Sequence, residues 1–252
     1  MIQVQSLSLQ YPKKTAFQNI SLTIQQGQVL AVVGPSGCGK TSFLYCLNRL
    51  IDLIPRCKVT GHIFLEGQDI YGPGINLIAL RKRIGMIFQK PNPFPVSIRK
   101  NLELPLRTHG VRRQNELDER IEVALKSVGL FEEVKDRLQA SAMTLSRGQQ
   151  QRLCLARALS LKPEIILLDE PCSSLDPLSS AVVEEFILKL KRQYTIILVT
   201  HNLAQAKRMA DSVALFWYQN GAGYLLEVGA CEQIFENPQQ EITASYIRGT
   251  QG

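Results

Sequence analysis

The sequence contains no segment long and apolar enough to cross a membrane. No apolar run in its 252 residues approaches the roughly 20 residues that a membrane-spanning helix needs. Residues 1–5 lack the basic and then apolar plan of a secretory signal peptide. Internal repeats, low-complexity tracts and long coiled-coil heptads are also missing. We therefore expect a globular chain that stays in the cytosol.

The cysteines form no framework of disulfides or metal ligands. None of the six lies in a CxxC pair or at a metal-ligand spacing, and most lie inside apolar stretches. They are Cys38, Cys46, Cys57, Cys154, Cys172 and Cys231. We predict that they are reduced and mostly buried, and that they pack as small hydrophobic groups.

Positive charge is in excess, but its distribution does not indicate a nucleic-acid groove. The formal net charge is +7, and the basic residues occur in short scattered groups, such as 81–83 and 112–113, without interleaved aromatic residues. A solvated surface, or a face near anionic lipid, is the better interpretation. The hydrophobic content of 45% suffices for a real core, either in one domain with an inserted subdomain or in two small domains.

A glycine-rich segment between an apolar run and a helical pattern is the most informative part of the chain. Residues 29–33 are all apolar, residues 34–41 read GPSGCGKT, and residues 43–47 are largely apolar. Strand, glycine-rich loop and helix in this order are the context of a phosphate-binding loop, where backbone N–H groups and the helix dipole converge on phosphate oxygens. The predicted nucleotide contacts here are Gly34, Pro35, Ser36, Gly37, Cys38, Gly39, Lys40, Thr41 and Ser42.

Three side chains of this loop have specific chemistry. Lys40 can reach the β- and γ-phosphates of a nucleotide, and the Thr41 hydroxyl can ligate a magnesium ion that bridges them. Because Cys38 lies inside the loop, alkylation of its thiol is expected to block nucleotide binding. The alternative is a chance glycine-rich turn before a helix, which the full pattern and its flanks disfavour.

A second apolar run ends in two carboxylates. Residues 165–168 lead directly to Asp169 and Glu170, which is the pattern of a buried parallel strand whose carboxyl end opens on a site. Asp169 can hold magnesium through its water shell, and Glu170 can polarise a water molecule. Alone the run could be an ordinary core strand, but together with the phosphate loop it favours a nucleoside triphosphatase.

Three further residues are candidates for the same chemistry. Ser146 is a good N-cap, so a second helix N-terminus, with Gly148 next to it, is suited to phosphate. The strand 195–200 delivers His201 at its end, where the ring can donate a hydrogen bond to a γ-phosphate or to attacking water. A lone histidine is usually structural, and Tyr11 by itself is best explained as a half-buried side chain at a strand end.

The rest of the chain predicts how these motifs are organised. Short alternating strands open the sequence, and three prolines at residues 91–95 predict a stiff, irregular loop after the strand that ends at Gln89. Residues 114–128 predict a helix within a mostly helical insert. The Asn220–Gly221 pair predicts a hairpin in a small terminal addition.

The order of these motifs resembles that of the ATP-binding subunits of ABC transporters, over essentially the whole chain. The resemblance implies an α/β P-loop NTPase fold with a RecA-like parallel sheet core, an antiparallel β subdomain and an inserted α-helical subdomain. We place the core and β subdomain at about 1–90 and 153–252 and the helical subdomain at about 91–152. The family binds ATP with Mg²⁺ between two copies, each phosphate loop facing the signature segment of the other copy. Residues 145–149, LSRGQ, resemble that signature, which implies nucleotide contacts from Ser146, Gly148 and Gln149.

The same resemblance implies roles for single residues. Gln89 resembles the glutamine that contacts magnesium and the attacking water and links the site to the membrane subunits. Tyr11 resembles the aromatic residue that stacks on adenine, and residues 173–176 resemble the loop that crosses the dimer interface. The implied catalytic residues are Glu170 as general base, His201 as switch histidine, Gln89 and Lys40, and the implied metal ligands are Thr41, Gln89 and Asp169.

Within this family the chain most resembles the ATPases of bacterial phosphate importers. The likeness is carried by residues 47–49, 52–55, 88–95, 97–98 and 169–173. It implies a homodimer of ATPase subunits that associates with two membrane-spanning permease subunits and a periplasmic or extracellular phosphate-binding protein, and it implies no nucleic acid. It also implies a peripheral location at the cytoplasmic face of the inner (plasma) membrane.

Two departures and three alternatives remain open. Arg147 stands where the signature usually has glycine, and Thr41–Ser42 stands where serine followed by threonine is common. We expect activity to survive both departures. The alternatives are an ATPase for another solute such as phosphonate or a polar amino acid, a soluble ABC ATPase that acts on nucleic acid or ribosomes, and a non-catalytic nucleotide-binding regulator. The presence of Glu170 and His201 argues against the last.

Overall fold

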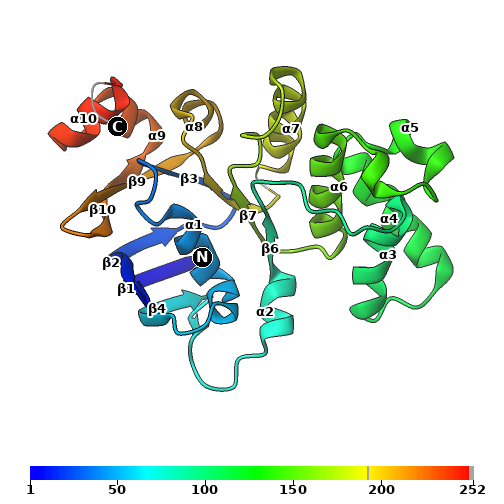
Figure 1. Cartoon of the computed structure of the whole chain (residues 1–252), viewed down its shortest axis with the longest axis horizontal. Helices are drawn as coiled ribbons and strands as arrows, with labels where there is room; N and C mark the ends of the chain where they lie inside the picture. Colours follow the sequence, from blue (N-terminus) through cyan, green and yellow to red (C-terminus); the bar gives the residue numbers. More distant parts are fainter. Residues whose placement is uncertain (192, 250–252) are drawn as a thin grey trace. The chain divides into compact units, whose positions relative to one another are not determined.

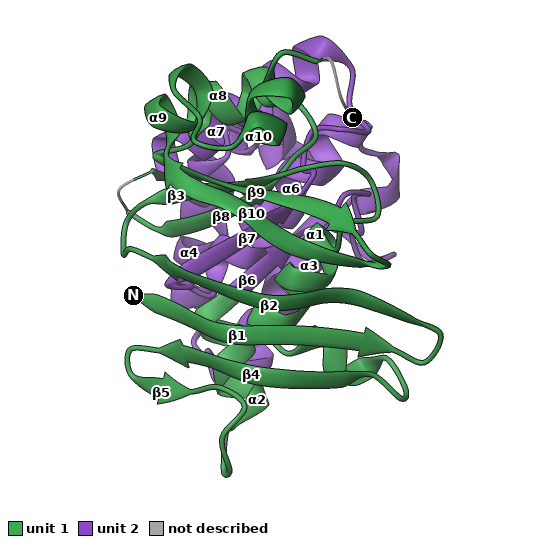
Figure 2. Cartoon of the chain, turned by 90° about the vertical axis from the view of Figure 1, so that its left-hand side faces the viewer, with its two compact units in different colours: residues 1–84, 191–252 green, residues 85–190 purple. Residues whose placement is uncertain are grey.

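The computed structural model describes residues 1–191 and 193–249, which cluster into two compact units (Figures 1 and 2). Unit 1 contains Met1–Ile84 and the segment from Lys191 onward, and unit 2 contains residues 85–190. Arg192 and residues 250–252, which fall within the predicted core segment 153–252, lie outside the described residues. In the described part of the chain, no helix is both long and apolar enough to cross a membrane.

Unit 1 combines a parallel and an antiparallel group of strands. Its strands are β1 (Ile2–Tyr11), β2 (Lys14–Ile24), β3 (Val29–Val33), β4 (Lys58–Leu65), β5 (Gln68–Asp69), β8 (Thr195–Val199), β9 (Ser212–Gln219) and β10 (Ala222–Ala230). Their order in the sheet is β5-β4-β1-β2-β10-β9-β3-β8. β1 pairs antiparallel with β2 and β4, whereas β3 lies between the parallel strands β8 and β9. The predicted α/β class, with a parallel core and antiparallel strands, is confirmed.

The core of unit 1 forms around β3 because every residue of that strand is apolar and buried. Phe43 packs edge-on against Phe216, with ring centroids 5.3 Å apart, and against Phe17 at 6.3 Å. Phe43 comes from the first of the helical segments of this unit. These segments are α1 (Lys40–Leu47), η1 (Leu50–Leu53), α2 (Leu77–Arg83), α8 (Leu203–Met209), α9 (Cys231–Glu236) and α10 (Glu241–Ile247).

The C-terminal strands belong to this core and are not a small addition to it. The predicted hairpin is confirmed, with Asn220 and Gly221 at the turn between β9 and β10 and φ angles of 52° and 82°. β9, however, pairs in parallel with β3, with Ala31 opposite Val213. The expectation of a small terminal addition is therefore wrong. The hairpin signal predicts only the pairing of β9 with β10, whereas the other side of β9 pairs with β3, which is far away in the sequence.

Unit 2 is largely helical. It contains β6 (Ile84–Ile87), except for its first residue, together with β7 (Ile165–Asp169), α3 (Ile98–Thr108), α4 (Gln114–Ser127), α5 (Phe131–Val134), η2 (Lys135–Arg137), η3 (Ala142–Thr144), α6 (Arg147–Ser160) and α7 (Pro177–Leu190). The predicted irregular loop at residues 91–95 is confirmed, because no helix or strand is found there. The subdomain boundaries near residues 91 and 152 stay a prediction.

Two helices of unit 2 bury one apolar face. In α4, which matches the predicted helix 114–128, Leu117 and Leu125 are buried, and Gly129 beyond its end has a φ of 61°. In α7, Val183 is buried, but the adjacent Val182 is 37% exposed. Two adjacent residues on a helix differ by about 100°, so only one of them can face the core fully.

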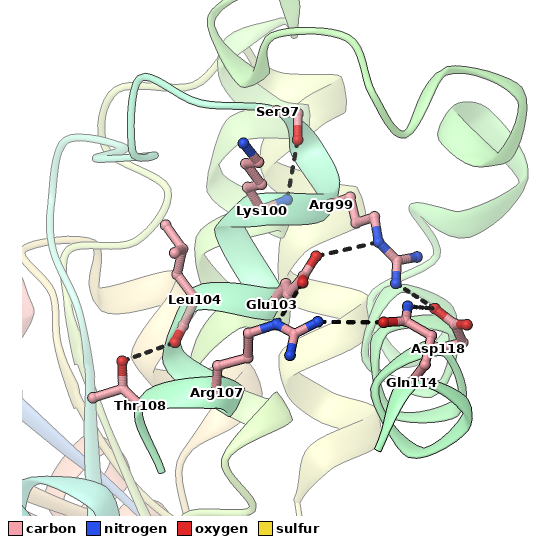
Figure 3. A network of polar contacts seen from close by, with 9 residues as sticks. All are labelled: Ser97, Arg99, Lys100, Glu103, Leu104, Arg107, Thr108, Gln114 and Asp118. Carbon is pink, nitrogen blue, oxygen red and sulfur yellow. Dashed lines mark hydrogen bonds and ion pairs between the residues drawn. The ribbon is translucent and has the colours of Figure 1, made fainter. Parts of the chain in front are cut away.

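A polar network joins α3 to α4 (Figure 3). Arg107 donates to Glu103 across 2.6 Å, and Arg99 lies 3.3 Å from the same carboxylate while it also pairs with Asp118 of α4. Gln114 accepts a hydrogen bond from Arg107 at 3.3 Å. Because several charges share partners, the network orients the two helices more specifically than isolated surface pairs would.

The aromatic cluster predicts a large loss of stability when its central ring is removed. Phe43→Ala deletes a fully buried ring, so the free energy of unfolding should fall by about 3–5 kcal/mol. The measurement is urea unfolding, followed by the fluorescence of the single tryptophan. Leu53→Ala, at a residue that is 67% exposed, is the control and should change stability by less than about 0.5 kcal/mol. A loss below about 1 kcal/mol in Phe43→Ala would contradict the assigned core.

Candidate functional site

The phosphate loop has the predicted context, with β3 before it and α1 directly after it. Its glycines adopt conformations that other residues rarely reach, with φ angles of 141° at Gly34, 84° at Gly37 and 97° at Gly39. A Cβ atom on Gly34 would lie 2.0 Å from the carbonyl oxygen of Phe216. Ser36 is exposed to solvent at the mouth of the loop. The loop therefore presents backbone to solvent where polyphosphate is predicted to bind.

The Lys40 ammonium group lies inside the loop. Its Nζ atom donates hydrogen bonds to the carbonyl oxygens of Gly34, at 2.7 Å, and Pro35, at 2.8 Å. The residue is only 7% exposed, so these oxygens replace the water that the charge has lost. An ammonium group has three N–H donors, so Lys40 can reach a phosphate oxygen with its third donor or by exchanging one of these carbonyl oxygens. Thr41, one residue further along α1, is exposed.

Cys38 is less accessible than its place in the loop suggests. The residue is 0% exposed, and its Sγ atom lies 3.8 Å from Lys40 Nζ. Burial raises the pKa of the Cys38 thiol, and the neighbouring Lys40 charge only partly opposes that shift. The thiol is therefore protonated and shielded at neutral pH. The sequence-based expectation that alkylation of Cys38 blocks nucleotide binding assumed an accessible thiol, and the native chain does not present one.

Tyr11 contacts the helix that follows the phosphate loop, and His201 follows a strand that pairs with the strand before the loop. The Tyr11 hydroxyl and the Ser42 hydroxyl are 3.0 Å apart, which places this half-buried tyrosine beside the start of α1. Burial raises the pKa of Tyr11, and the Ser42 hydrogen bond opposes the rise. β8 pairs in parallel with β3, Val199 opposite Val32, so His201 follows at the edge of the sheet where the phosphate loop begins. Adenine stacking by Tyr11 and a γ-phosphate contact by His201 stay predictions.

In unit 2, two predicted catalytic residues are in contact. β7 is buried along its whole length and ends at Asp169, which is 5% exposed. Glu170 follows with a φ of 46°, a left-handed conformation that is uncommon for a residue other than glycine. The Gln89 amide nitrogen donates to the Glu170 carboxylate across 3.1 Å, and the Ser174 hydroxyl donates to the Gln89 carbonyl oxygen at 3.3 Å. The carboxylate predicted as the base is thereby linked to the start of the proline-rich loop.

The signature segment begins α6 with a complete capping box, as Ser146 predicted. The Ser146 hydroxyl accepts from the Gln149 N–H at 3.2 Å, and the Gln149 side-chain oxygen accepts from the Ser146 N–H at 3.0 Å. The Gln149 side-chain nitrogen donates to Glu133 at 2.7 Å. The hydrogen bond from Arg152 to the same carboxylate holds the pKa of Glu133 below its usual range. Both ends of the Gln149 amide thus bind within unit 2, and its second N–H and second lone pair are the groups with which it could contact a nucleotide without breaking these bonds.

The two signature residues between Ser146 and Gln149 have contrasting surroundings. Gly148 is buried, and a Cβ atom there would lie 2.8 Å from the Ser179 hydroxyl oxygen, so a side chain would displace the start of α7. Arg147 is the first residue of α6 and is exposed. Its long side chain therefore has room to lie along the surface, which is consistent with the expectation that the chain tolerates arginine at this position.

Sequence reasoning missed the residues that hold the proline-rich loop in place. Asn101 is 0% exposed, accepts a hydrogen bond from the Phe94 N–H at 2.7 Å, and donates to the carbonyl oxygens of Phe94 at 3.1 Å and Ser97 at 3.0 Å. Arg157 donates to the Asn92 side chain at 3.0 Å and lies over the Phe94 ring, 4.3 Å from its centroid. A polar residue on the buried face of the helix 98–108 was the available signal for Asn101.

The predicted metal ligands suit magnesium in their chemistry. Thr41, Gln89 and Asp169 offer hydroxyl, amide and carboxylate oxygens, the hard donors that Mg²⁺ prefers. Among the described residues, no group of three or more histidine, cysteine, aspartate or glutamate side chains could hold a metal by itself. Because Thr41 belongs to unit 1 while Gln89 and Asp169 belong to unit 2, the assembly of these ligands in one site stays a prediction.

The chain is similar in sequence to a known protein family and to two named proteins. Residues 17–173 match the family model described as ABC transporter. Over all 252 residues the chain is 54% identical to the phosphate import ATP-binding protein PstB 1 of Nitrosococcus oceani, of which it covers 91%. It is 48% identical over 252 residues to the phosphate import ATP-binding protein PstB 1 of Enterococcus faecalis, of which it covers 98%. The family match contains the phosphate loop, the signature segment and both carboxylates at the end of β7.

The burial of Cys38 predicts slow and pH-dependent alkylation. Only the thiolate reacts with iodoacetamide. Because the pKa of Cys38 is raised, the thiolate is a small fraction of this residue at neutral pH, and labelling should accelerate as the pH rises toward that pKa. At pH 8, peptide mass spectrometry should find the partly exposed Cys57 labelled at least about tenfold faster than Cys38. In Cys57→Ser the native chain should react slowly until urea unfolds it. Equal labelling rates at Cys38 and Cys57 would contradict the buried position.

Proposed function

The chain belongs to the ABC transporter family, and we propose that it is the ATP-hydrolysing subunit that energises the import of inorganic phosphate. The observation that carries the proposal is identity over the full length with two proteins named for phosphate import, 54% in one case and 48% in the other. The residues at the end of β3 and at the end of β7 are of the types that phosphoryl transfer from ATP requires.

Hydrolysis needs a water molecule that attacks the γ-phosphorus atom and a group that takes its proton. Glu170 orients this water and accepts the proton, while the bond between the γ-phosphorus and the bridging oxygen breaks and ADP leaves with that oxygen. In the structure one Glu170 oxygen accepts a hydrogen bond from Gln89, so the Gln89 side chain lies beside the group that would take the proton of the attacking water. Gln89 thereby places the base under the control of the loop that follows it.

The charge that develops on the γ-phosphoryl group needs donors that are already in place. Lys40 supplies an ammonium group, the N–H groups of the phosphate loop supply dipoles, and His201 supplies a ring N–H. Thr41, Asp169 and Gln89 would hold Mg²⁺, which neutralises phosphate charge when it is bound. Tyr11 would stack on the adenine, with its ring already fixed beside α1 by Ser42.

The signature segment makes a second copy of the chain part of the same proposal. The α6 N-terminus carries Ser146 and Gly148 and presents helix N–H groups to an anion. We infer that it completes the ATP site of a second copy, so that ATP binding closes a homodimer and hydrolysis reopens it. Arg147 would add a positive charge near this second contact.

The proline-rich loop is the proposed contact with the membrane partners. Asn101 and Arg157 hold residues 92–97 in one conformation, and the Phe94 ring remains 42% exposed. A loop that is fixed from inside and exposed outside can pass movement to a partner without first becoming ordered. The proposed partners are two membrane-spanning permease subunits and a phosphate-binding protein on the other side of the membrane, with the chain peripheral at the cytoplasmic face.

The role of Glu170 predicts a variant that binds ATP but scarcely hydrolyses it. Glu170→Gln keeps the size of the side chain and removes the proton acceptor, so hydrolysis should fall about 10²- to 10⁴-fold, with ATP-bound dimer accumulating in size-exclusion chromatography. Glu185→Gln is the matched control, because that glutamate is 62% exposed and Lys189 in α7 is its ion-pair partner among the described residues. Turnover at the wild-type rate in Glu170→Gln would refute the assignment of this residue as the base.

The cargo is tested in the assembled transporter. The chain would be copurified from membranes with its permease, and the complex reconstituted in lipid vesicles together with the solute-binding protein. Hydrolysis is followed by ADP formation, because added phosphate would mask a phosphate-release assay. Phosphate should stimulate hydrolysis, while phosphonate and polar amino acids should not. Stimulation by one of those solutes and not by phosphate would show that the solute, and not phosphate, is the cargo. Stimulation by DNA or ribosomes without a membrane partner would refute the proposed role in transport.

A further inference from the structure

Two side chains from different segments of unit 2 hold the backbone on either side of Gln89. The side-chain nitrogen of Gln151, on α6, donates a hydrogen bond to the carbonyl oxygen of Phe88 at 3.2 Å. The Ser174 hydroxyl donates to the carbonyl oxygen of Gln89 itself at 3.3 Å. The peptides before and after Gln89 are therefore both anchored, and together they set the direction in which its Cα–Cβ bond points.

This direction matters because the Gln89 side chain is exposed to solvent. An exposed glutamine has several accessible rotamers, and few neighbouring atoms select among them. Its amide nitrogen lies 3.1 Å from the Glu170 carboxylate, a contact that depends on where the backbone presents the side chain. The backbone of Glu170 is held as well, because the Ser173 hydroxyl donates to its carbonyl oxygen at 3.1 Å. Both members of the contact thus depend on anchored main chain.

Gln151 is a costly residue for the place that it occupies. It is 1% exposed, and its side-chain oxygen is buried without a hydrogen-bond partner among the described residues. Turning the amide around would not help, because the oxygen would then face the Phe88 carbonyl oxygen. A buried polar atom without a partner costs stability, and an apolar side chain of the same shape can be neutral or stabilising. Packing therefore does not explain a glutamine here, whereas the hydrogen bond to Phe88 does.

We propose that Gln151 is a positioning residue for ATP hydrolysis, which holds the Phe88 carbonyl and so directs Gln89 toward Glu170. Gln151 touches neither ATP nor the attacking water in this role. Because Gln89 acts beside the proposed base, loss of the hydrogen bond lowers kcat more than it raises KM for ATP. The inference rests on the proposed function in that ATP hydrolysis is the reaction.

The first test replaces the amide by an apolar side chain of similar length. Gln151→Met removes both the donor and the oxygen that has no partner. In the full chain with ATP and Mg²⁺, kcat should fall about three- to tenfold, the effect of one lost hydrogen bond, while KM for ATP changes less than about twofold. Hydrolysis is followed by ADP formation. An unchanged kcat in folded Gln151→Met would overturn the inference.

A double-mutant cycle tests whether the effect passes through Gln89. In a Gln89→Ala background there is no amide to direct, so Gln151→Met should lower kcat further by less than about twofold. Equal factors in the two backgrounds would overturn the inference, because they would show that Gln151 acts elsewhere. Ser174→Ala removes only a hydroxyl and should show the same dependence on Gln89. It gives the same decision if Gln151→Met does not fold.

A control variant separates positioning from loss of packing. Ile121 is 2% exposed on α4, so Ile121→Val should lower the midpoint of urea unfolding and leave kcat unchanged. The midpoint of Gln151→Met should not fall below that of Ile121→Val, because removal of the oxygen without a partner offsets the lost hydrogen bond. A kcat as low in Ile121→Val as in Gln151→Met would contradict a positioning role.

Amide hydrogen exchange separates this inference from the proposed function. Exchange in residues 86–90, measured without nucleotide, should be faster in Gln151→Met than in the wild type and unchanged in Ile121→Val. Unchanged exchange in Gln151→Met would show that Gln151 does not hold this segment. A wild-type chain that does not hydrolyse ATP would refute the ATPase proposal, whereas wild-type hydrolysis with an unaffected Gln151→Met variant would refute the role of Gln151 alone.

Discussion

The close approach of the Phe216 carbonyl to the Cα of Gly34 is the constraint on which the phosphate loop of unit 1 depends. A side chain at this position would overlap the oxygen, so β9 and the phosphate loop can be neighbours only because residue 34 is glycine. That proximity follows from the pairing of β9 with β3, which also aligns β3 with β8 on its other side. One steric condition thus brings the loop and three strands from both ends of the sequence into a single arrangement.

In unit 2, side-chain hydrogen bonds, and not a steric contact, hold the candidate site residues and the proline-rich loop in place. β7 brings Asp169 and Glu170 to the end of a buried strand, and the contact between Gln89 and Glu170 links that end to the proline-rich loop. Because the prolines keep that loop out of a β-sheet, its backbone groups have no strand partner. Asn101, buried on α3, forms hydrogen bonds with the backbone N–H and carbonyl oxygen of Phe94 instead. The irregular loop therefore owes its shape to residues outside it, which is the usual way in which a loop without regular structure becomes a defined surface.

The sequence predicted those parts of the fold that depend on local chemistry. The helix start at Ser146 follows from a capping box, the hairpin at 220–221 from the tolerance of asparagine and glycine for positive φ, and the buried strand 165–169 from an unbroken apolar run. The candidate site residues rest on the same kind of local signal, because a phosphate loop and a strand that ends in carboxylates are compact patterns, and their roles stay predictions.

What the sequence did not predict depends on contacts between distant residues. The place of β9 beside β3 requires a partner roughly 180 positions away, and the inward position of Cys38 depends on how the whole loop folds around Lys40. Such arrangements become visible only when the strands are in register.

If Lys40 binds nucleotide as proposed, the carbonyl oxygens that bind it have a consequence for the end of each catalytic cycle. A buried ammonium group with no partner would be costly, and a site that left it unpaired would hold its spent nucleotide tightly. Because Gly34 and Pro35 offer their own oxygens to Lys40, the charge remains satisfied when the product departs. On the proposed function, the loop can therefore exchange ADP for fresh ATP without either collapsing or retaining the product.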